Sequence, residues 1–241
     1  MSTSTSTTTT TTLTSLPTLP ALPSPKPMLL TTAITTRHST RRFLSTPPPL
    51  TTLHTALTLA THAPSNSNIQ PWCLYLLSGP ALARLKTALL SAASSTPTGP
   101  AIPPLPAAFQ RFRSALGQQV YGVGLGISHS DTAGRRAAVL RNFDFFGAPV
   151  AAIVCMDKRL SSADAVSVGM YVQTLLLALT EQGVGTCVEV AVAGYPEVIR
   201  DVVKEIPESM DILCGVAIGY EDPTMKVNHI YTPRNLVAQI D

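Results

Sequence analysis

The chain has 241 residues, 45% of them hydrophobic and 13% charged, which is enough for one domain with a large buried core. Its net charge is +3, and the densest basic cluster holds only Arg37, Arg41 and Arg42. That is too little for a nucleic-acid-binding surface, although it suffices for one phosphate group. The four cysteines and five histidines lack the close pairs of a metal site, so we expect no bound metal.

The first 26 residues form a low-complexity segment, a Ser/Thr run followed by Leu-Pro units. This composition buries too little apolar surface to offset the entropy of ordering, so we predict a disordered tail over residues 1–26 and one folded domain over 27–241. No secretory signal follows Met1, and Lys26 is the only charge before Arg37, which argues against a mitochondrial leader. Because three of the four cysteines lie in apolar runs, as free core thiols do, we expect a cytoplasmic protein.

Hydrophobic spacing divides the folded domain into helices and strands. The predicted helices cover about residues 28–34, 50–60, 80–93, 109–120, 131–143, 164–180 and 196–204. The predicted strands cover 72–77, 148–156 and 212–218, and residues 227–240 are expected to be extended. Residues 94–106 hold five prolines and a glycine and are predicted to form a loop or lid.

Two negative indications narrow the class of protein. Strands separated by helices ordinarily suggest a parallel dinucleotide-binding sheet, but no GxGxxG follows a strand, and Gly122–Gly126 is interpreted as a plain loop. The apolar helix at 164–180 is short for a bilayer span and is interrupted by Ser167 and Gln173. We therefore expect a buried helix and no membrane association.

Two short stretches carry polar side chains at every second position. In an extended segment, Arg37, Ser39 and Arg41 share one face, and two guanidiniums with a hydroxyl between them suit a phosphate monoester. The alternative is a solvated basic turn. Amide side chains also alternate at 66–70, where they could bind a heterocycle edge or simply cap a helix and form a turn.

Taken together and in order, these stretches resemble the nitroreductase family. The resemblance covers about residue 27 to the C-terminus, and its blocks are Arg37-His38-Ser39-Thr40-Arg41, Ala63-Pro64-Ser65-x-x-Asn68-x-Gln70-Pro71-Trp72, Phe145-Phe146-Gly147-Ala148-Pro149, Gly183-Val184-Gly185-Thr186-Cys187, Ala193-Gly194-Tyr195-Pro196-Glu197, Gly215-x-x-x-Gly219-Tyr220 and Asn228-x-x-x-x-x-Arg234. The resemblance implies an α+β fold, a mainly antiparallel sheet flanked by helices, in an intertwined homodimer whose central interface helix is 164–180.

The resemblance also implies an FMN site with three parts. The phosphate and ribityl chain would be held by Arg37, His38, Ser39, Arg41 and Arg234. The ring of the partner subunit's flavin would contact Pro64, Ser65, Asn66, Asn68 and Gln70. Backbone near the reactive nitrogen would come from Val188, Glu189, Val190 and Ala191, where many relatives carry Pro-Gln or Pro-Ile in place of Val188-Glu189. If Glu189 points into the pocket, its charge disfavours an anionic reduced flavin.

The implied activity is a ping-pong transfer of a hydride from NADPH or NADH, through FMN, to a small electron-poor acceptor such as a nitroaromatic or quinone. The flavin carries the redox chemistry, so no catalytic side chain is expected. Two alternatives remain open at this point: an oxygen-dependent FMN dehydrogenase that desaturates a biosynthetic intermediate, and a flavin-binding module without turnover. The residues do not choose between NADH and NADPH.

Overall fold

The computed structural model describes residues 28–95, 104–230 and 232–235. The predicted tail over 1–26 lies outside the described residues, as do residues 96–103 of the proline-rich segment and residues 236–241 at the C-terminal end.

Four strands form one antiparallel sheet in the order β1-β2-β4-β3. The strands are β1 (Cys73–Ser78), β2 (Val150–Asp157), β3 (Gly185–Glu189) and β4 (Met210–Gly219). Every neighbouring pair is antiparallel although helices separate the strands in sequence, which confirms the α+β class that the resemblance implied. β3 was not predicted; it is a five-residue edge strand whose Gly-rich start resembles a loop.

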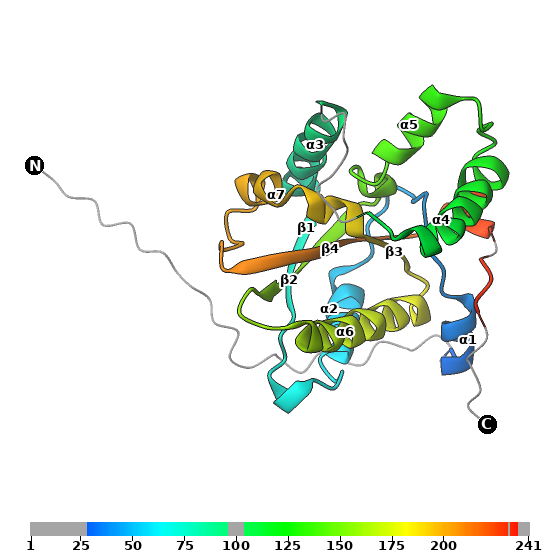
Figure 1. Cartoon of the computed structure of the whole chain (residues 1–241). Coiled ribbons are helices and arrows are strands. Elements are labelled where there is room, and N and C mark those ends of the chain that lie inside the picture. The colour runs from blue at the N-terminus through cyan, green and yellow to red at the C-terminus, as the bar shows by residue number, and fades with distance from the viewer. Residues whose placement is uncertain (1–27, 96–103, 231, 236–241) are drawn as a thin grey trace, which may run out of the picture.

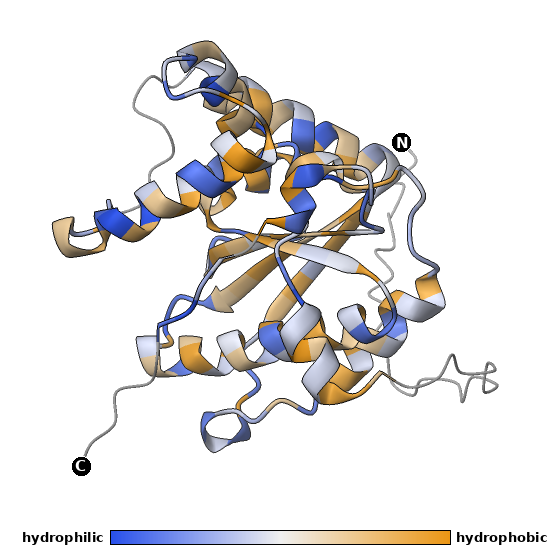
Figure 2. Cartoon of the chain, turned by 90° about the vertical axis from the view of Figure 1, so that its right-hand side faces the viewer, coloured by the Kyte–Doolittle hydropathy of each residue, from blue (hydrophilic) through white to orange (hydrophobic). Residues whose placement is uncertain are grey.

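Helices cover both faces of the sheet (Figure 1). α2 (Leu50–Ala60) and α6 (Ser162–Glu181) pack on one face, and α3 (Gly79–Ser95) and α7 (Pro196–Val202) pack on the other. Successive residues of β2 enter the two cores alternately, with Val150 on the α6 side and Ala151 on the α3 side. β2 is therefore apolar at every central position, and Figure 2 shows the strands as a hydrophobic layer between more mixed helices.

α6 is the longest helix described. Ser161 and Asp164 form a capping box at its N-terminus, and the ring of Tyr171 stacks on Trp72 with centroids 4.7 Å apart. Within the described residues, α6 is the one helix long and apolar enough to cross a membrane, but half of that window is buried in the fold. It packs against α2 and the sheet, as the predicted buried helix should.

The remaining elements lie beside this sandwich. α1 (Leu30–Thr36) precedes the basic stretch, and α4 (Gln110–Gly117) continues through a π-helical turn, Gln118–Gly124, into a loop and α5 (Thr132–Leu140). The interpretation of Gly122–Gly126 as a plain loop was wrong for its first half, because Gly122 and Gly124 belong to this helical turn. A Cβ at Gly124 would lie 2.9 Å from the Cα of Val227, so the glycine permits close packing.

Short 3-10 turns complete the chain at Asn66–Asn68, Ala107–Phe109, Phe145–Gly147, Val190–Gly194 and Lys226–His229. The last of these corrects the prediction that residues 227–240 are extended from their start. Val227 and Asn228 are buried there, since the turn packs against the helical segment that holds Gly124.

Candidate functional site

The basic stretch after α1 lies along the free edge of β3. Ser39 forms a parallel β-bridge with Thr186, and the Thr40 N–H donates to the Thr186 carbonyl at 2.9 Å. A Cβ at Gly185 would lie 2.5 Å from the Thr40 hydroxyl oxygen, so the strand needs glycine for this contact. The stretch is therefore extended, as its alternating pattern predicted, and is fixed to the sheet by its backbone.

Asn228 clamps the same stretch from the other side. Its Oδ1 accepts hydrogen bonds from the backbone N–H groups of Arg41 at 2.8 Å and Arg42 at 3.2 Å. Its Nδ2 donates to the carbonyls of Arg42 at 2.9 Å and Asp222 at 3.0 Å. The side chain is 2% exposed and forms four hydrogen bonds, so it ties two segments 186 residues apart into one unit.

Positive side chains gather at this edge. Burial lowers the pKa of the Arg37 guanidinium, and the nearby charge of Arg234 lowers it further. Burial raises the pKa of the Cys187 thiol, and the charge of Arg41 and a side-chain hydrogen bond with Ser39 both oppose that rise, so both residues lie near this thiol. The structure thus brings Arg37, Ser39, Arg41 and Arg234 within electrostatic reach of one another, and like charges held together in this way favour an anion between them.

His38 points elsewhere. Its Nε2 lies 2.7 Å from a carboxylate oxygen of Glu221, and its Nδ1 lies 2.9 Å from the Thr36 carbonyl. Both ring nitrogens lie within hydrogen-bonding distance of an oxygen atom. His38 therefore braces the stretch against Glu221, on the side of the segment away from its two arginines.

Glu189 closes β3 with its side chain inside the protein. It is 3% exposed, and its Oε1 is a buried atom without a hydrogen-bond partner in the described structure. Burial raises the pKa of Glu189 to about 7, against the opposing effects of Cys187 and Arg41. Val188 and Val190 on either side are exposed, and Ala191 is half-buried, so the chain presents apolar surface around a buried acid.

The amide-rich turn lies at the N-terminus of α6. The Asn66 N–H donates to Ser167 Oγ at 3.2 Å, and Asn66 Nδ2 donates to Asp164 Oδ1 at 3.1 Å. Ser65 Oγ accepts from the Gln70 N–H at 3.1 Å, and Asn68 has a left-handed φ of 56°. Pro64, Asn66, Asn68 and Gln70 are exposed and Ser65 is half-buried, so the turn presents its amides to the outside.

One chain does not bring the two predicted halves of the site together. The turn contacts the first residues of α6, whereas the basic stretch contacts β3, which follows the last residues of α6. A helix of 20 residues spans about 30 Å at 1.5 Å per residue. The two halves therefore lie near opposite ends of α6 (Figure 1).

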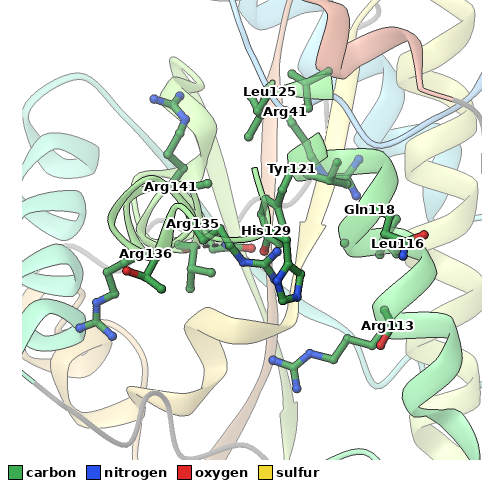
Figure 3. Close-up of a pocket in the computed structure, with 18 of the residues that line it drawn as sticks. Arg41, Arg113, Leu116, Gln118, Tyr121, Leu125, His129, Arg135, Arg136 and Arg141 are labelled. Carbon is green, nitrogen blue, oxygen red and sulfur yellow. Dashed lines mark hydrogen bonds between the residues drawn. The ribbon is translucent and has the colours of Figure 1, made fainter. Parts of the chain in front are cut away.

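A cavity of about 790 Å³ adjoins the basic stretch. Its walls come from α4, the π-helical turn, the loop after it and α5, with Arg41 at the sheet side. Figure 3 shows Arg41 at one end of this space and Arg113 at the other, with Tyr121, His129 and Arg135 between them. The sequence analysis predicted a loop or lid over residues 94–106 and did not identify this cavity.

Sequence reasoning also passed over the residues that hold the site residues in place. Thr186, Glu221 and Asn228 bind the basic stretch through contacts that span some 150 residues or more, and no local pattern signals such pairings. Asn228 did stand in a recognised block, together with Arg234. No group of His, Cys, Asp or Glu in the described ranges has the geometry of a metal site.

Comparison with known proteins gives one consistent result. Residues 34–220 match the model of the Nitroreductase family. The chain is 33% identical over 207 residues to 4-nitrobenzoate reductase of Pseudomonas putida, covering 84% of this chain and 90% of that protein. It is 34% identical over 201 residues to nitrobenzene nitroreductase of Ectopseudomonas oleovorans, covering 80% and 87%.

A solved structure is similar over the same range. The crystal structure of the FMN-dependent nitroreductase NfnB from Mycobacterium smegmatis, in complex with NADPH, superposes with a TM-score of 0.80 at 30% identity. The match covers 87% of this chain and 96% of that one. The family match over residues 34–220 includes all four strands and both the 37–41 and the 64–70 stretches.

Proposed function

The chain belongs to the nitroreductase family, and we propose on that basis that it is an FMN-dependent oxidoreductase that transfers a hydride from NAD(P)H to an electron-poor acceptor. The relatives that it matches are named for the reduction of nitrobenzene and 4-nitrobenzoate, so nitroaromatics are the proposed class of acceptor. The observation that carries the proposal is the basic stretch at 37–41, fixed along β3 beside Arg234.

The residues present at this edge fit FMN. Two arginines and a serine lie where their charges and hydroxyl can meet one phosphate, and Arg234 adds a third cation. Glu189 leaves a buried oxygen without a partner beside Arg41, so polar capacity remains for a ligand. When bound, FMN supplies the two-electron redox chemistry of its isoalloxazine ring.

The chain's own groups position the reactants and exclude water. Arg37, Ser39, Arg41 and Arg234 would hold the phosphate of FMN, and the backbone of residues 188–191 would face its ring. Val188 and Val190 present apolar surface that keeps water from the reacting face. The raised pKa of Glu189 keeps its carboxyl largely neutral up to about pH 7, so the chain places little extra negative charge beside an electron-rich ring.

The site requires a second copy of the chain. The turn at 64–70 and the basic stretch lie near opposite ends of α6, so one flavin meets both only if the turn comes from a partner. Large apolar side chains are exposed near this part of the fold, with Leu50 79%, Leu30 65% and Val166 63% exposed. A homodimer would cover them. All four cysteines are free, which suits a cytoplasmic enzyme.

The test of the activity is an absorbance spectrum of the purified protein, recorded before and after anaerobic addition of NADPH and then NADH. Flavin bands that bleach with either nucleotide, and return with a nitroaromatic, are the expected result. Bands that persist with both nucleotides would favour the dehydrogenase or the binding module, and a colourless protein that fails to take up FMN would refute the assignment.

The test of the shared site is the variant Val166→Glu. A charge on this exposed position of α6 should leave the single chain folded but separate the two copies, and FMN affinity should fall at least tenfold. Val123→Glu is the matched control, because Val123 is 47% exposed and lies outside α6. Light scattering and FMN fluorescence titration report both quantities; a monomer that binds FMN as well as the parent protein would contradict the shared site.

A further inference from the structure

The cavity that adjoins the basic stretch at 37–41 is lined by an excess of positive charge. Its described lining contains five arginines and no carboxylate: Arg41, Arg113, Arg135, Arg136 and Arg141. Arg41 belongs to the predicted phosphate site, whereas the other four arginines come from α4, α5 and the residue that follows α5. The cavity therefore extends the positive region well beyond the part that one flavin phosphate requires.

Of these five arginines, only Arg141 has an ion pair, and two have neither a side-chain hydrogen bond nor an ion pair within the described residues. Arg136 donates to the carbonyls of Ala93 and Ser94, and Arg141 lies 3.7 Å from a carboxylate oxygen of Asp144. Within the described residues, Arg113 has no hydrogen bond or ion pair, and Arg135 only lies over the ring of Tyr121, 5.2 Å from its centroid. Arg113 projects from α4 and Arg135 from α5, so the two approach the cavity from different walls (Figure 3).

The position of these two side chains indicates which ligand they meet. In Figure 3, Arg41 of the proposed phosphate site lies at one end of the cavity, Arg113 lies at the other end, and Arg135 lies between them. A single-ring acceptor that reacts at the flavin is too short to extend to that far end. A dinucleotide does extend that far, because its adenosine half lies remote from its nicotinamide, and 790 Å³ is within the usual range for a site of this kind.

We propose that Arg113 and Arg135 bind the 2′-phosphate of NADPH and make this enzyme prefer NADPH to NADH. The inference rests on the proposed function, in which the nicotinamide nucleotide is the co-substrate. The two nucleotides differ only in that phosphate monoester, and arginine is the side chain that accommodates it in other nucleotide sites. Two forked donors without a competing carboxylate match a dianionic group.

The test uses the FMN-loaded protein and the variants Arg113→Gln and Arg135→Gln. We expect each variant to raise the concentration of NADPH that gives half-maximal anaerobic flavin bleaching by about tenfold. The corresponding concentration of NADH should rise by less than about twofold. Calorimetric titration with adenosine 2′-monophosphate gives a second readout that needs no turnover, and its affinity should fall in parallel. Arg111→Gln is the matched control, since Arg111 lies on α4 over the Phe112 ring and does not line the cavity.

Three outcomes would overturn the inference. One is a parent protein that uses both nucleotides equally well, and another is a loss of affinity in the variants that is equal for NADPH and NADH. The third is unchanged nucleotide binding with slower reoxidation by 4-nitrobenzoate but not by its methyl ester, which would assign the arginines to an acceptor carboxylate. A flavin that neither nucleotide bleaches would refute the proposed function itself, which is a separate result.

Discussion

The basic stretch at 37–41 and the amide turn at 64–70 are both predicted to bind the same cofactor, yet they are held in place by different contacts. The basic stretch is fixed by backbone pairing to β3 and by the buried amide of Asn228. The amide turn is exposed and is held by side chains at the start of α6, with a left-handed backbone at Asn68.

This difference suggests that the two segments contribute to cofactor binding in different ways. A group that must bind a phosphate dianion gains from rigid, partly buried cations, because charge-assisted bonds strengthen away from water. A group that approaches a ring from another subunit must remain accessible until the two chains meet. We therefore expect changes near the basic stretch to affect stability and phosphate binding strongly, and changes in the turn to have small effects on ring binding.

Asn228→Ala should have the largest effect. The substitution removes four hydrogen bonds and leaves the N–H groups of Arg41 and Arg42 without partners, while the two carbonyls each keep one backbone N–H donor. We expect a loss of about 3 kcal/mol in the free energy of unfolding. FMN affinity should fall as well, because the stretch loses its clamp. Urea unfolding and FMN titration measure the two losses. Asn142→Ala removes one local hydrogen bond to the Val139 carbonyl and should change the stability and the FMN affinity far less than Asn228→Ala does. Equal effects at both positions would argue against the role of Asn228.

Glu189→Gln should remove a pH dependence of stability that is of nearly the same size. Because burial raises the pKa of Glu189 from 4.5 to about 7, the folded state keeps a proton that the unfolded chain has already lost. The stability of the parent protein is therefore fully present below pH 4.5 and falls as the pH rises through 7, by roughly 3 kcal/mol in all. The glutamine variant lacks this decline. Urea unfolding of both proteins at pH 5 and pH 8 gives the difference, and parallel curves at the two pH values would be inconsistent with a buried carboxyl.

Arg37→Gln should lower the affinity for FMN about thirtyfold and leave that for riboflavin unchanged, since riboflavin lacks the phosphate. Fluorescence titration with both flavins separates phosphate binding from ring binding. Arg84→Gln removes the same charge from an exposed site on α3 and should leave both affinities unchanged. Equal losses for FMN and riboflavin would mean that Arg37 acts on the fold instead of on the phosphate.

Asn68→Ala should have the smallest effect, a loss of about fivefold that is the same for FMN and riboflavin, as expected for one neutral hydrogen bond to the ring. Alanine also disfavours the left-handed φ of 56° at this position, so Asn68→Gly provides the control that keeps the backbone and removes the amide. If the glycine variant binds both flavins as well as the parent protein does, the turn contributes only its shape.

The sequence predicted the parts of the fold that depend on local hydrophobic patterns. β1, β2 and β4 are apolar runs, and the helices except the π-helical turn follow helical spacing, so each was found within a few residues. The antiparallel order of the strands came from the family resemblance, because pairing between distant segments leaves no local signal. β3 was not predicted because its five residues begin at Gly185, and glycine is common in loops and uncommon in strands.

The candidate site divides in the same way. Arg37, Ser39 and Arg41 were visible as an alternating basic pattern, and the structure places them together. The direction of the His38 side chain depends on Glu221, which is 183 residues away in sequence. The inward direction of the Glu189 side chain depends on the register of β3 against β4. A single sequence carries the residue types of a site far better than their directions.

The burial of the cysteines affects how easily the enzyme is alkylated by reactive compounds. Burial raises the pKa of Cys155 and Cys214 to about 12 and that of Cys187 well above its ordinary value, so none of the three forms thiolate near neutral pH. Thiolate is the form that attacks electrophiles. Partly reduced nitro compounds are electrophiles, so an enzyme that reduces nitroaromatics exposes only the half-buried Cys73 to alkylation. The same packing that builds the core thus shields the catalyst from its own substrates and products.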